Sequence, residues 1–182
     1  MIFTEKEITL RDGRRAVLRA PREEDAQELL DFLRTACGES DYLARYPEEL
    51  RFTSESERQY IKNTLDNPNG MMIICTVNGR IAGNCEIIFM GSMKTRHRAA
   101  VMIGLLREYW SLGIGSALFS ELIAAARERP GVHQLELEMI GGNERAFALY
   151  RRMGFEVMAE HPDAFILRDG SVRSAVFMRR VL

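Results

Sequence analysis

The sequence predicts a single α/β domain in which helices flank one mixed β-sheet. Helical and strand-like hydrophobic patterns alternate along all 182 residues. An Asn-Gly pair separates two strand-like runs, and a nearly unbroken apolar run at 99–106 leads straight into a glycine-bearing turn and an apolar helix. One domain is the default for a chain of this length, so we expect the unit to span residues 1–182.

The first third of the chain predicts a hairpin and two helices. Residues 9–20 alternate loosely around an Asp-Gly pair, which is typical of a hairpin or a first strand. A helix is expected over 21–34, because acidic residues fill its first turn, where the helix dipole favours them. A second helix is expected over 54–65, opened by a capping box of Ser54 and Glu57.

The middle of the chain predicts three strands. Residues 71–77 and 80–90 are rich in Ile, Val and Phe, and Asn78-Gly79 between them is a strong hairpin signal. The apolar run at 99–106 is typical of a central strand that is covered on both faces.

The remaining elements are expected to be two helices and three strands. Residues 113–128 are apolar on most sides, which predicts a largely buried helix. Residues 133–140 alternate as a strand, and 143–153 form a helix that begins at an asparagine cap and ends before a glycine. Two strand-like segments, 164–168 and 172–181, close the chain.

Composition excludes several classes of protein. With 25 Lys and Arg against 26 Asp and Glu, the chain lacks the positive excess of a nucleic-acid binder. No apolar run approaches the roughly 20 residues of a membrane span, and the start lacks the pattern of a signal peptide, so we expect a cytoplasmic protein without a membrane partner. The three cysteines and three histidines are scattered, and we expect neither a disulfide framework nor a metal site.

The most informative stretch for chemistry is the turn at 110–116. A strand runs into Gly113-Ile114-Gly115, which opens a helix. Glycines let backbone approach a ligand closely, and the free N–H groups of a helix start favour an anion such as a pyrophosphate. The alternative is a tight turn that only packs the helix on the sheet. No Gly-Lys-Ser/Thr of a Walker loop and no third dinucleotide-site glycine follow.

A second pattern is a helix that carries Asn143 and Tyr150. Seven residues separate the two side chains, so they lie on nearly the same face, about 10 Å apart along the axis. They could therefore line one ligand. The alternative is that Asn143 only caps the helix and Tyr150 only packs.

Together the two patterns resemble the GNAT superfamily of acyl-CoA-dependent N-acetyltransferases. Its motif A matches at 110–115, and its motif B matches at Asn143, Ala146, Leu149-Tyr150 and Gly154-Phe155. The resemblance implies a mixed, mostly antiparallel central sheet flanked by helices. It also implies direct transfer of an acetyl group from the thioester of acetyl-CoA, a co-substrate, to a primary amine, with no metal.

The resemblance also implies roles for individual residues. Tyr150 matches the general acid, which we interpret as a hydrogen-bond donor to the leaving thiolate. Glu138 matches the position of a general base, with Glu136 on the same strand face and Glu86 as a further candidate. The residues expected to hold acetyl-CoA are Ile103, Gly104, Leu105, Leu112, Gly113, Ile114, Gly115, Ser116 and Asn143.

Two departures from the family pattern keep alternatives open. Trp110 replaces the usual Gln or Arg, and Ala100 stands where many relatives place a Glu. A non-catalytic acyl-CoA-binding regulatory module of the same fold is therefore an alternative, and a nucleotide-binding α/β protein is a third.

The acceptor is left open by the sequence. It is either an amine-bearing small molecule or the N-terminus or a lysine of a protein, and a homodimer is also left open. The acidic loop at 38–53 would suit a cationic amine. The basic Lys94-to-Arg98 loop is expected to be solvated, with contact to the 3′-phosphate of CoA or to an acidic acceptor as the minority interpretation.

Overall fold

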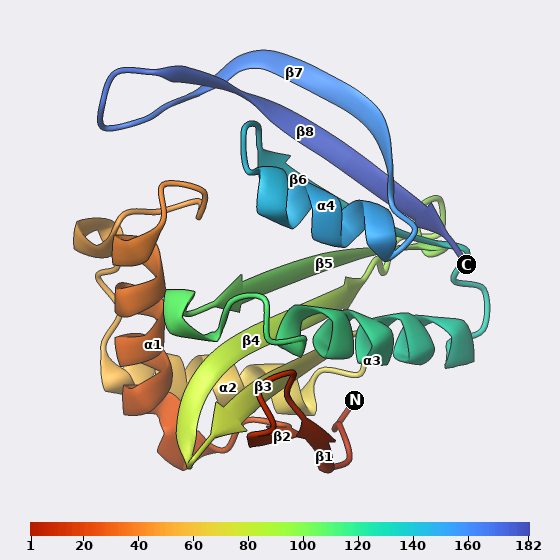
Figure 1. Cartoon of the computed structure of the whole chain (residues 1–182). Coiled ribbons are helices and arrows are strands. Elements are labelled where there is room, and N and C mark those ends of the chain that lie inside the picture. The colour runs from red at the N-terminus through yellow and green to blue at the C-terminus, as the bar shows by residue number, and fades with distance from the viewer.

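The computed structural model describes all 182 residues. The chain forms one eight-stranded sheet with helices on both of its faces (Figure 1). The strands are β1 (Lys6–Thr9), β2 (Arg15–Arg19), β3 (Gly70–Val77), β4 (Arg80–Phe89), β5 (Arg98–Leu105), β6 (Gln134–Ile140), β7 (Glu156–Ile166) and β8 (Val172–Val181). The helices are α1 (Ala26–Glu39), α2 (Ser54–Asp66), α3 (Ile114–Glu128) and α4 (Glu144–Arg152). Short 3-10 turns lie at Glu23–Asp25, Pro47–Glu49 and Arg107–Tyr109.

The sheet has the strand order β1-β2-β3-β4-β5-β6-β8-β7, which confirms the predicted mixed, mostly antiparallel sheet. Every neighbouring pair is antiparallel except β5 and β6. These two strands run parallel and pair only over 98–100 and 134–136, after which they diverge. The sheet is therefore split at its centre, and the second half, β6-β8-β7, turns away from the first (Figure 1).

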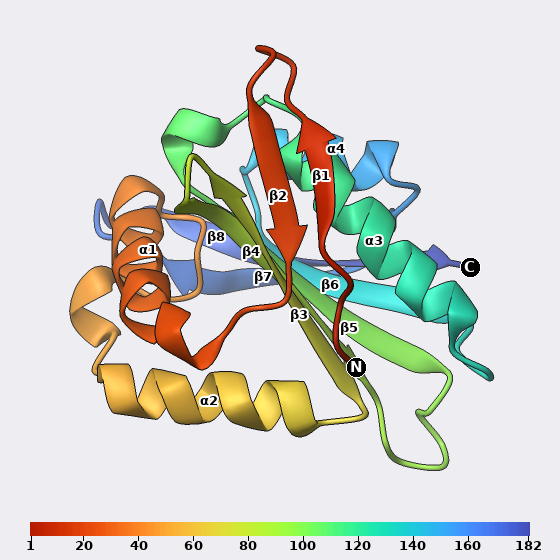
Figure 2. The ribbon, with the colours of Figure 1, turned by 90° about the horizontal axis from the view of Figure 1, so that it is seen from below.

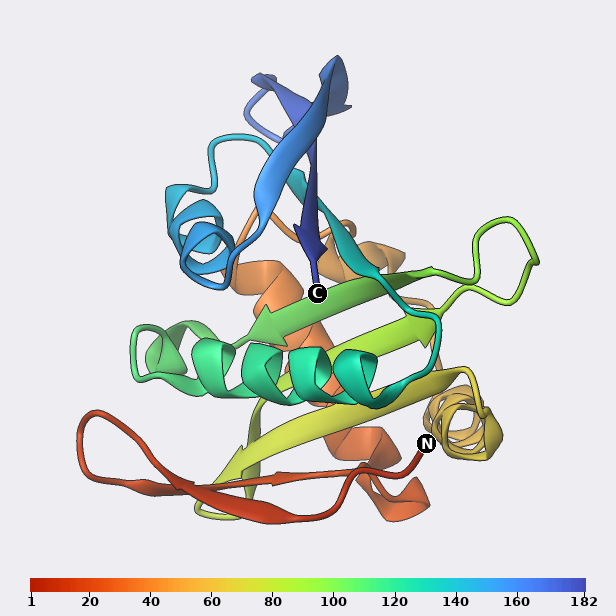
Figure 3. The same ribbon diagram turned by 90° about the vertical axis from the view of Figure 1, so that its right-hand side faces the viewer.

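The helices cover the two faces of the sheet unequally. Helices α1 and α2 lie on one face of the β3–β5 region, and α3 lies on the other (Figures 2 and 3). Helix α4 sits beside the β7–β8 hairpin in the second half (Figure 1). No helix has both the length and the apolar character that a membrane span requires.

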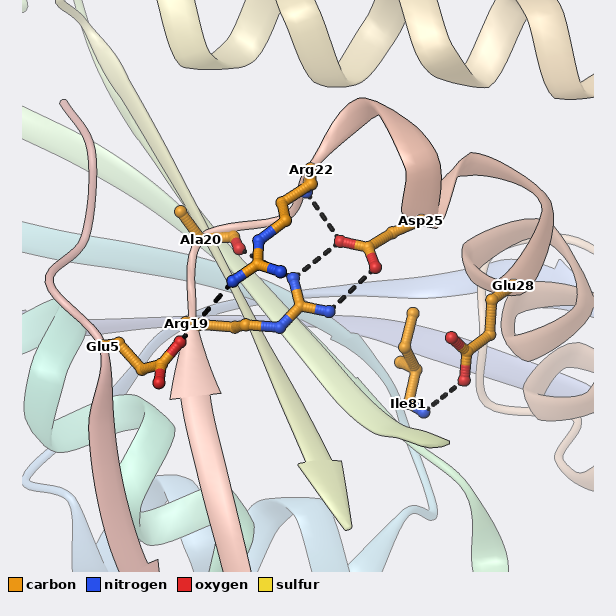
Figure 4. Close-up of polar contacts among 7 residues, drawn as sticks. All are labelled: Glu5, Arg19, Ala20, Arg22, Asp25, Glu28 and Ile81. Carbon is orange, nitrogen blue, oxygen red and sulfur yellow. Dashed lines mark hydrogen bonds and ion pairs between the residues drawn. The ribbon is translucent and has the colours of Figure 1, made fainter. Parts of the chain in front are cut away.

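Polar contacts attach the start of α1 to two strands (Figure 4). Arg19 on β2 forms a bidentate ion pair with Asp25, with N–O distances of 2.6 and 2.8 Å. Glu28 accepts a hydrogen bond of 2.8 Å from the backbone N–H of Ile81 on β4. Because a bidentate Arg–carboxylate pair constrains direction as well as distance, these contacts orient α1 on the sheet.

Both N-terminal helices were predicted, with shifted boundaries. Helix α1 runs to Glu39, five residues beyond the expected end at Arg34, because Ala36 and Cys37 continue its buried stripe. The capping box of α2 lies one residue earlier than the predicted pair of Ser54 and Glu57. Thr53 is the cap and accepts a 3.2 Å bond from the N–H of Ser56, while Glu57 is buried.

Strand β5 is not covered on both faces as its apolar run predicts. One face packs in the core, but Met102 is 48% exposed, and Ala100 and Gly104 are only partly buried. The apolar residues of that second face line a cavity, described below.

Strand β7 is longer than predicted, starting at Glu156 where the sequence indicated Ala164. Most of its residues are exposed, and its only neighbour is β8, so no hydrophobic alternation marks it. Pro162 and a left-handed Asp163 (φ 52) coincide with an irregularity in its pairing. Such interruptions are tolerated at a sheet edge, where a lost ladder bond faces solvent.

We expect Gly83→Ala to reduce the free energy of unfolding by about 1–3 kcal/mol, the usual range for overpacking. Gly83 lies opposite Leu105, and a Cβ there would meet the Leu105 side chain at 2.2 Å and the carbonyl oxygen of Gly104 at 3.0 Å. Leu105 can rotate away, but the carbonyl belongs to the neighbouring strand. Urea unfolding measures the loss.

The matched control is Gly91→Ala, because nothing lies within 4 Å of a Cβ at Gly91. This variant should change stability by less than about 0.5 kcal/mol. Equal stabilities for the two variants would contradict the close approach of β4 and β5 at Gly83.

Candidate active site

A cavity of about 1080 Å³ opens where β5 and β6 diverge. Both strands line it, together with the turn before α3, the face of α4, the loop after α1 and the β7–β8 hairpin. Of the residues expected to act in catalysis or to hold acetyl-CoA, those that line it are Ile103, Gly104, Leu105, Gly113, Gly115, Ser116, Glu138, Asn143 and Tyr150. Leu112 and Ile114 do not: the carbonyl of Leu112 is bonded to Arg11, and the side chain of Ile114 is fully buried.

The turn before α3 leaves backbone donors free at one end of the cavity. Gly113 has a φ of +99°, which only glycine adopts easily, and α3 begins directly after it. The first helical bond runs from the N–H of Ala117 to the carbonyl of Gly113, so the preceding N–H groups have no partner inside the helix. No acidic residue lies in this first turn. The residues present therefore fit a phosphate-bearing ligand.

Gly115 serves packing at the same place. A Cβ on Gly115 would lie 2.9 Å from the side chain of Leu149 on α4 and 3.4 Å from that of Leu105 on β5. The two interpretations of the glycine pair, close approach of a ligand and tight packing of the helix, therefore apply to different residues. Gly113 shapes the turn, and Gly115 lets α3 approach α4.

Arg11, which the sequence did not indicate, fastens this turn from the β1–β2 hairpin. Its backbone N–H donates to the carbonyl of Leu112 at 3.0 Å, and its guanidinium donates to the carbonyl of Ser111 at 3.2 Å. Because Arg11 also lines the cavity, it adds positive charge beside the free N–H groups.

Trp110, the departure from the family pattern, holds a second arginine at this end. Its indole N–H donates to the carbonyl of Leu105 at 3.0 Å, and the guanidinium of Arg145 lies 3.2 Å from the ring centroid. Arg107 lies over the same ring at 5.4 Å. Burial and the neighbouring Arg107 lower the pKa of Arg145, which is in no ion pair. An anion here would relieve the repulsion between the two cations.

Tyr150 lies deep in the cavity wall with its ring held by aromatic neighbours. It is 8% exposed, and its ring centroid lies 5.4 Å from that of Phe119 and 6.3 Å from that of Phe155. Burial raises the pKa of Tyr150 to about 12. Its hydroxyl therefore stays protonated at neutral pH and can donate a hydrogen bond into the cavity.

The three candidate carboxylates occupy different surroundings. Glu138 is exposed, lines the cavity and lies opposite Phe177 of β8. Glu136 also lines it, but Arg98 donates to both of its oxygens, one bond being 2.7 Å. Burial opposes the charge of Glu136, yet these hydrogen bonds hold its pKa below the usual value. Of the two, only Glu138 is free to accept a proton from a ligand.

Glu86 does not line the cavity. It lies beneath α2, where the hydroxyl of Tyr60 donates to its two oxygens at 2.9 and 2.8 Å. Burial raises the pKa of Glu86, although the Tyr60 hydrogen bond works in the opposite direction. This candidate base therefore lies inside the fold, outside the cavity that Tyr150 and Glu138 line.

Asn143 both caps α4 and lines the cavity. Its side chain accepts a 3.2 Å bond from the N–H of Ala146. The basic loop behaves as mainly solvated: Lys94, Arg96 and His97 do not line the cavity, and Arg98 is paired with Glu136.

Aromatic and apolar residues form the other end of the cavity. Tyr42 and Leu43 come from the loop after α1, and Phe165 and Phe177 come from the β7–β8 hairpin. The backbone N–H of Arg168 in this hairpin donates to the hydroxyl of Tyr46 at 3.0 Å, which joins loop and hairpin. The sequence indicated the acidity of this loop but not these walls, because the side chains come together only in the folded chain.

Comparison with known proteins supplies the family. The model of the acetyltransferase (GNAT) family matches residues 28–155. The chain belongs to this family. It is 24% identical to the L-amino acid N-acetyltransferase AaaT of Escherichia coli (strain K12) over 136 residues, which cover 75% of this chain and 83% of that protein.

Solved structures agree on the fold. An acetyltransferase of the GNAT family from Streptococcus pneumoniae matches with a TM-score of 0.86 and 24% identity, covering 92% of this chain and 99% of that one. The structure of yncA from Salmonella typhimurium with its cofactor acetyl-CoA matches with a TM-score of 0.78 and 17% identity, covering 92% of this chain and 94% of that one.

The position of Glu86 leads to a prediction about stability. Its folded-state pKa is raised, so the stability it contributes is complete below its unfolded pKa, about 4.3, and is lost as pH rises through the folded pKa. Between about pH 4 and pH 8, the unfolding free energy of the wild type should therefore fall relative to that of Glu86→Gln. Urea unfolding at several pH values measures this slope, and a flat difference would contradict it.

Proposed function

We propose that the protein is an acetyl-CoA-dependent N-acetyltransferase that transfers the acetyl group directly to a primary amine. The observation that carries the proposal is one cavity into which a neutral phenol, a free carboxylate and the unbonded N–H groups of a helix start all converge. These belong to Tyr150, Glu138 and the first turn of α3.

The residues that would hold acetyl-CoA lie along β5 and at the start of α3. Beyond Ala100, the edge of β5 that faces β6 has no strand partner, so its backbone groups at 103–105 are available to an amide-bearing chain. The N–H groups at 112–116 would hold the pyrophosphate, with Arg11 and Arg145 adding positive charge. The side chain of Trp110 positions Arg145 in place of the usual polar residue.

The protein must first remove a proton from the acceptor amine. A lysine-like amine, with a pKa of about 10.4, is neutral at pH 7 in only about one molecule in 10³. Glu138 accepts this proton as the nitrogen attacks the thioester carbon. The new N–C bond forms and the C–S bond breaks.

Tyr150 acts on the leaving sulfur. A phenol with a pKa of about 12 is a much weaker acid than a thiol, whose pKa is about 8.5. Complete proton transfer from Tyr150 to the thiolate is therefore uphill. Tyr150 donates a hydrogen bond to the developing thiolate, and the proton that completes the thiol comes from water or, by way of the phenol, from solvent.

The rival function is a non-catalytic acyl-CoA-binding module. Ala100, which lines the cavity in place of a carboxylate, favours this rival, whereas the free Glu138 favours the enzyme. The deciding experiment is CoA release from acetyl-CoA with amino acids, polyamines, and peptides that offer an N-terminus or a lysine. Binding of acetyl-CoA without release above the background rate for any amine would favour the module.

We expect Tyr150→Phe to lower kcat by roughly 10²–10³-fold, the usual cost of removing one hydrogen-bond donor to a developing negative charge. The ring and its contacts with Phe119 remain, so the Kd for acetyl-CoA should stay within about two-fold by isothermal titration. The loss should shrink with an acyl donor whose thiol has a lower pKa. Turnover at the wild-type rate would show that the hydroxyl plays no chemical role.

We expect Glu138→Gln to lower kcat/KM by at least about ten-fold at pH 7 and by less at pH 9, where more of the amine is already neutral. The pH profile of kcat/KM measures this. Glu86→Gln is the matched control and should leave the profile unchanged, because Glu86 lies outside the cavity. If the Glu138 profile overlays the wild type, a water chain removes the proton.

A further inference from the structure

The part of the main cavity that would receive the acceptor amine, the acceptor end, has apolar and aromatic walls. These are Tyr42 and Leu43 from the loop after α1, Met102 from β5, and Phe165 and Phe177 from the β7–β8 hairpin. Met102 lies on a strand in the middle of the sheet, yet it is 48% exposed. A concave site lined mainly by apolar and aromatic side chains is typical of a pocket for a small molecule with an apolar part.

The strand registers place Glu138 among these apolar side chains. Strands β5 and β6 pair at Ala100 and Glu136, so Met102 and Glu138, two residues further along each strand, lie on the same face of the sheet. Phe177 lies opposite Glu138 on β8. The carboxylate that would receive the proton therefore has an apolar side chain on each of the two strands beside it.

The β7–β8 hairpin reaches over the loop after α1 at the acceptor end (Figure 1). The backbone N–H of Arg168 donates to the hydroxyl of Tyr46 at 3.0 Å, and its guanidinium lies 4.0 Å from the Tyr46 ring centroid and pairs with Glu48. This junction follows Phe165 by three residues. It restricts the room for a protein segment attached to the amine more than the room for a small molecule.

The arginines that line the main cavity leave the acceptor end without a free cation. They are Arg11, Arg98, Arg145 and Arg152. Arg11 and Arg145 lie beside the turn before α3, and Arg98 is bonded to Glu136. Arg152 is exposed in the last turn of α4, about 12 Å along the axis from the start of that helix.

Arg173 does not supply the missing cation, because it lies behind the turn at 141–143. A Cβ on Gly142 in this turn would lie 3.6 Å from Nε of Arg173 and 3.6 Å from the hydroxyl of Tyr42. Only Tyr42 lines the main cavity, whereas Arg173 lines a smaller one of about 380 Å³. A carboxylate on the acceptor would therefore meet aromatic rings and a neutral phenol, and burial of an unpaired charge is costly.

The acidic loop after α1 does not add negative charge to the acceptor end. Its residues Glu39, Glu48 and Glu49 each accept hydrogen bonds from within the fold, and no acidic residue of 38–53 lines the main cavity. The carboxylates in the wall that form no ion pair are Glu138 and Glu144, and Glu144 lies in the first turn of α4, where the helix dipole stabilises its charge. The acceptor end is thus suited to one amine rather than to several.

We propose that the acceptor is a small primary monoamine that carries an aromatic or branched apolar group and no carboxylate. Its amine faces Glu138, and its apolar group packs against Tyr42, Met102, Phe165 and Phe177. The inference rests on the proposed acetyl transfer and gives it a substrate class. A free amino acid is disfavoured because its carboxylate would have no cation, and a polyamine because its further ammonium groups would lose their hydration among apolar side chains.

The test is a CoA-release assay with acceptors that differ in one group. Phenethylamine should exceed L-phenylalanine by at least about 100-fold in kcat/KM, because the carboxylate would be an unpaired charge in an apolar site. It should exceed ethylamine by about 10–100-fold, as expected for the burial of one large apolar group. Pentylamine should exceed the diamine cadaverine, and phenethylamine should exceed a peptide with an N-terminal phenylalanine.

Phe165→Ala should lower the preference for phenethylamine over ethylamine by about 3–10-fold, because one aromatic contact is lost. The use of ethylamine itself should stay within about two-fold. The matched control is Ile166→Ala, since Ile166 is the next residue of β7, is 75% exposed and does not line the main cavity. This control should leave the preference unchanged.

Equal use of phenethylamine and phenylalanine by the wild type would overturn the proposal, even if Phe165→Ala failed to fold. Better turnover of cadaverine than of pentylamine would also overturn it and would indicate a second acidic contact, at Glu144. A preference for the peptide would assign the acceptor to protein N-termini instead. If no amine in the panel releases CoA, the acetyl transfer itself fails. If amines are acetylated whatever group they carry, only the substrate class fails.

Discussion

The candidate active site depends on the short stretch over which β5 and β6 pair. The two strands are parallel neighbours over three residue pairs, and the Arg98–Glu136 ion pair clamps them at that point. Beyond the clamp they diverge, which leaves one edge of β5 without a partner and opens the cavity. Unpaired backbone inside a sheet is costly unless something else bonds to it. A ligand with its own amide groups can supply those bonds, so the split in the sheet offers a place for such a ligand to bind.

The cavity is polarised along its length. Free N–H groups, Arg11 and Arg145 gather where α3 begins, and no acidic residue occupies its first turn. The far end carries Glu138 and aromatic walls. An elongated ligand with phosphates at one end and a reactive thioester at the other would be held in one direction, and a second molecule would approach from the opposite side.

Trp110 illustrates how a departure from a motif can be compensated in the fold. The indole brings no charge to the turn, but it holds the guanidinium of Arg145 against its face. Stacking on an aromatic ring keeps the cation in place without a carboxylate that would neutralise it. The positive charge thus comes from α4, a different element from the one that lost the polar residue.

Local patterns in the sequence determined most of the elements, the glycine-bearing turn before α3, the cap at Asn143 and the two faces of β6, because neighbouring residues decide each of these. They could not determine the start of β7 at Glu156, because this part of the edge strand is exposed and has no hydrophobic alternation. Nor could they tell that the second apolar face of β5 borders a cavity, or that Glu86 lies under α2 while Glu138 is free. The convergence of Tyr42 and Arg173 on Gly142 is likewise absent from any local pattern. These features depend on contacts between segments far apart in the chain, and only tertiary packing decides which side chains are buried, paired or left without a partner.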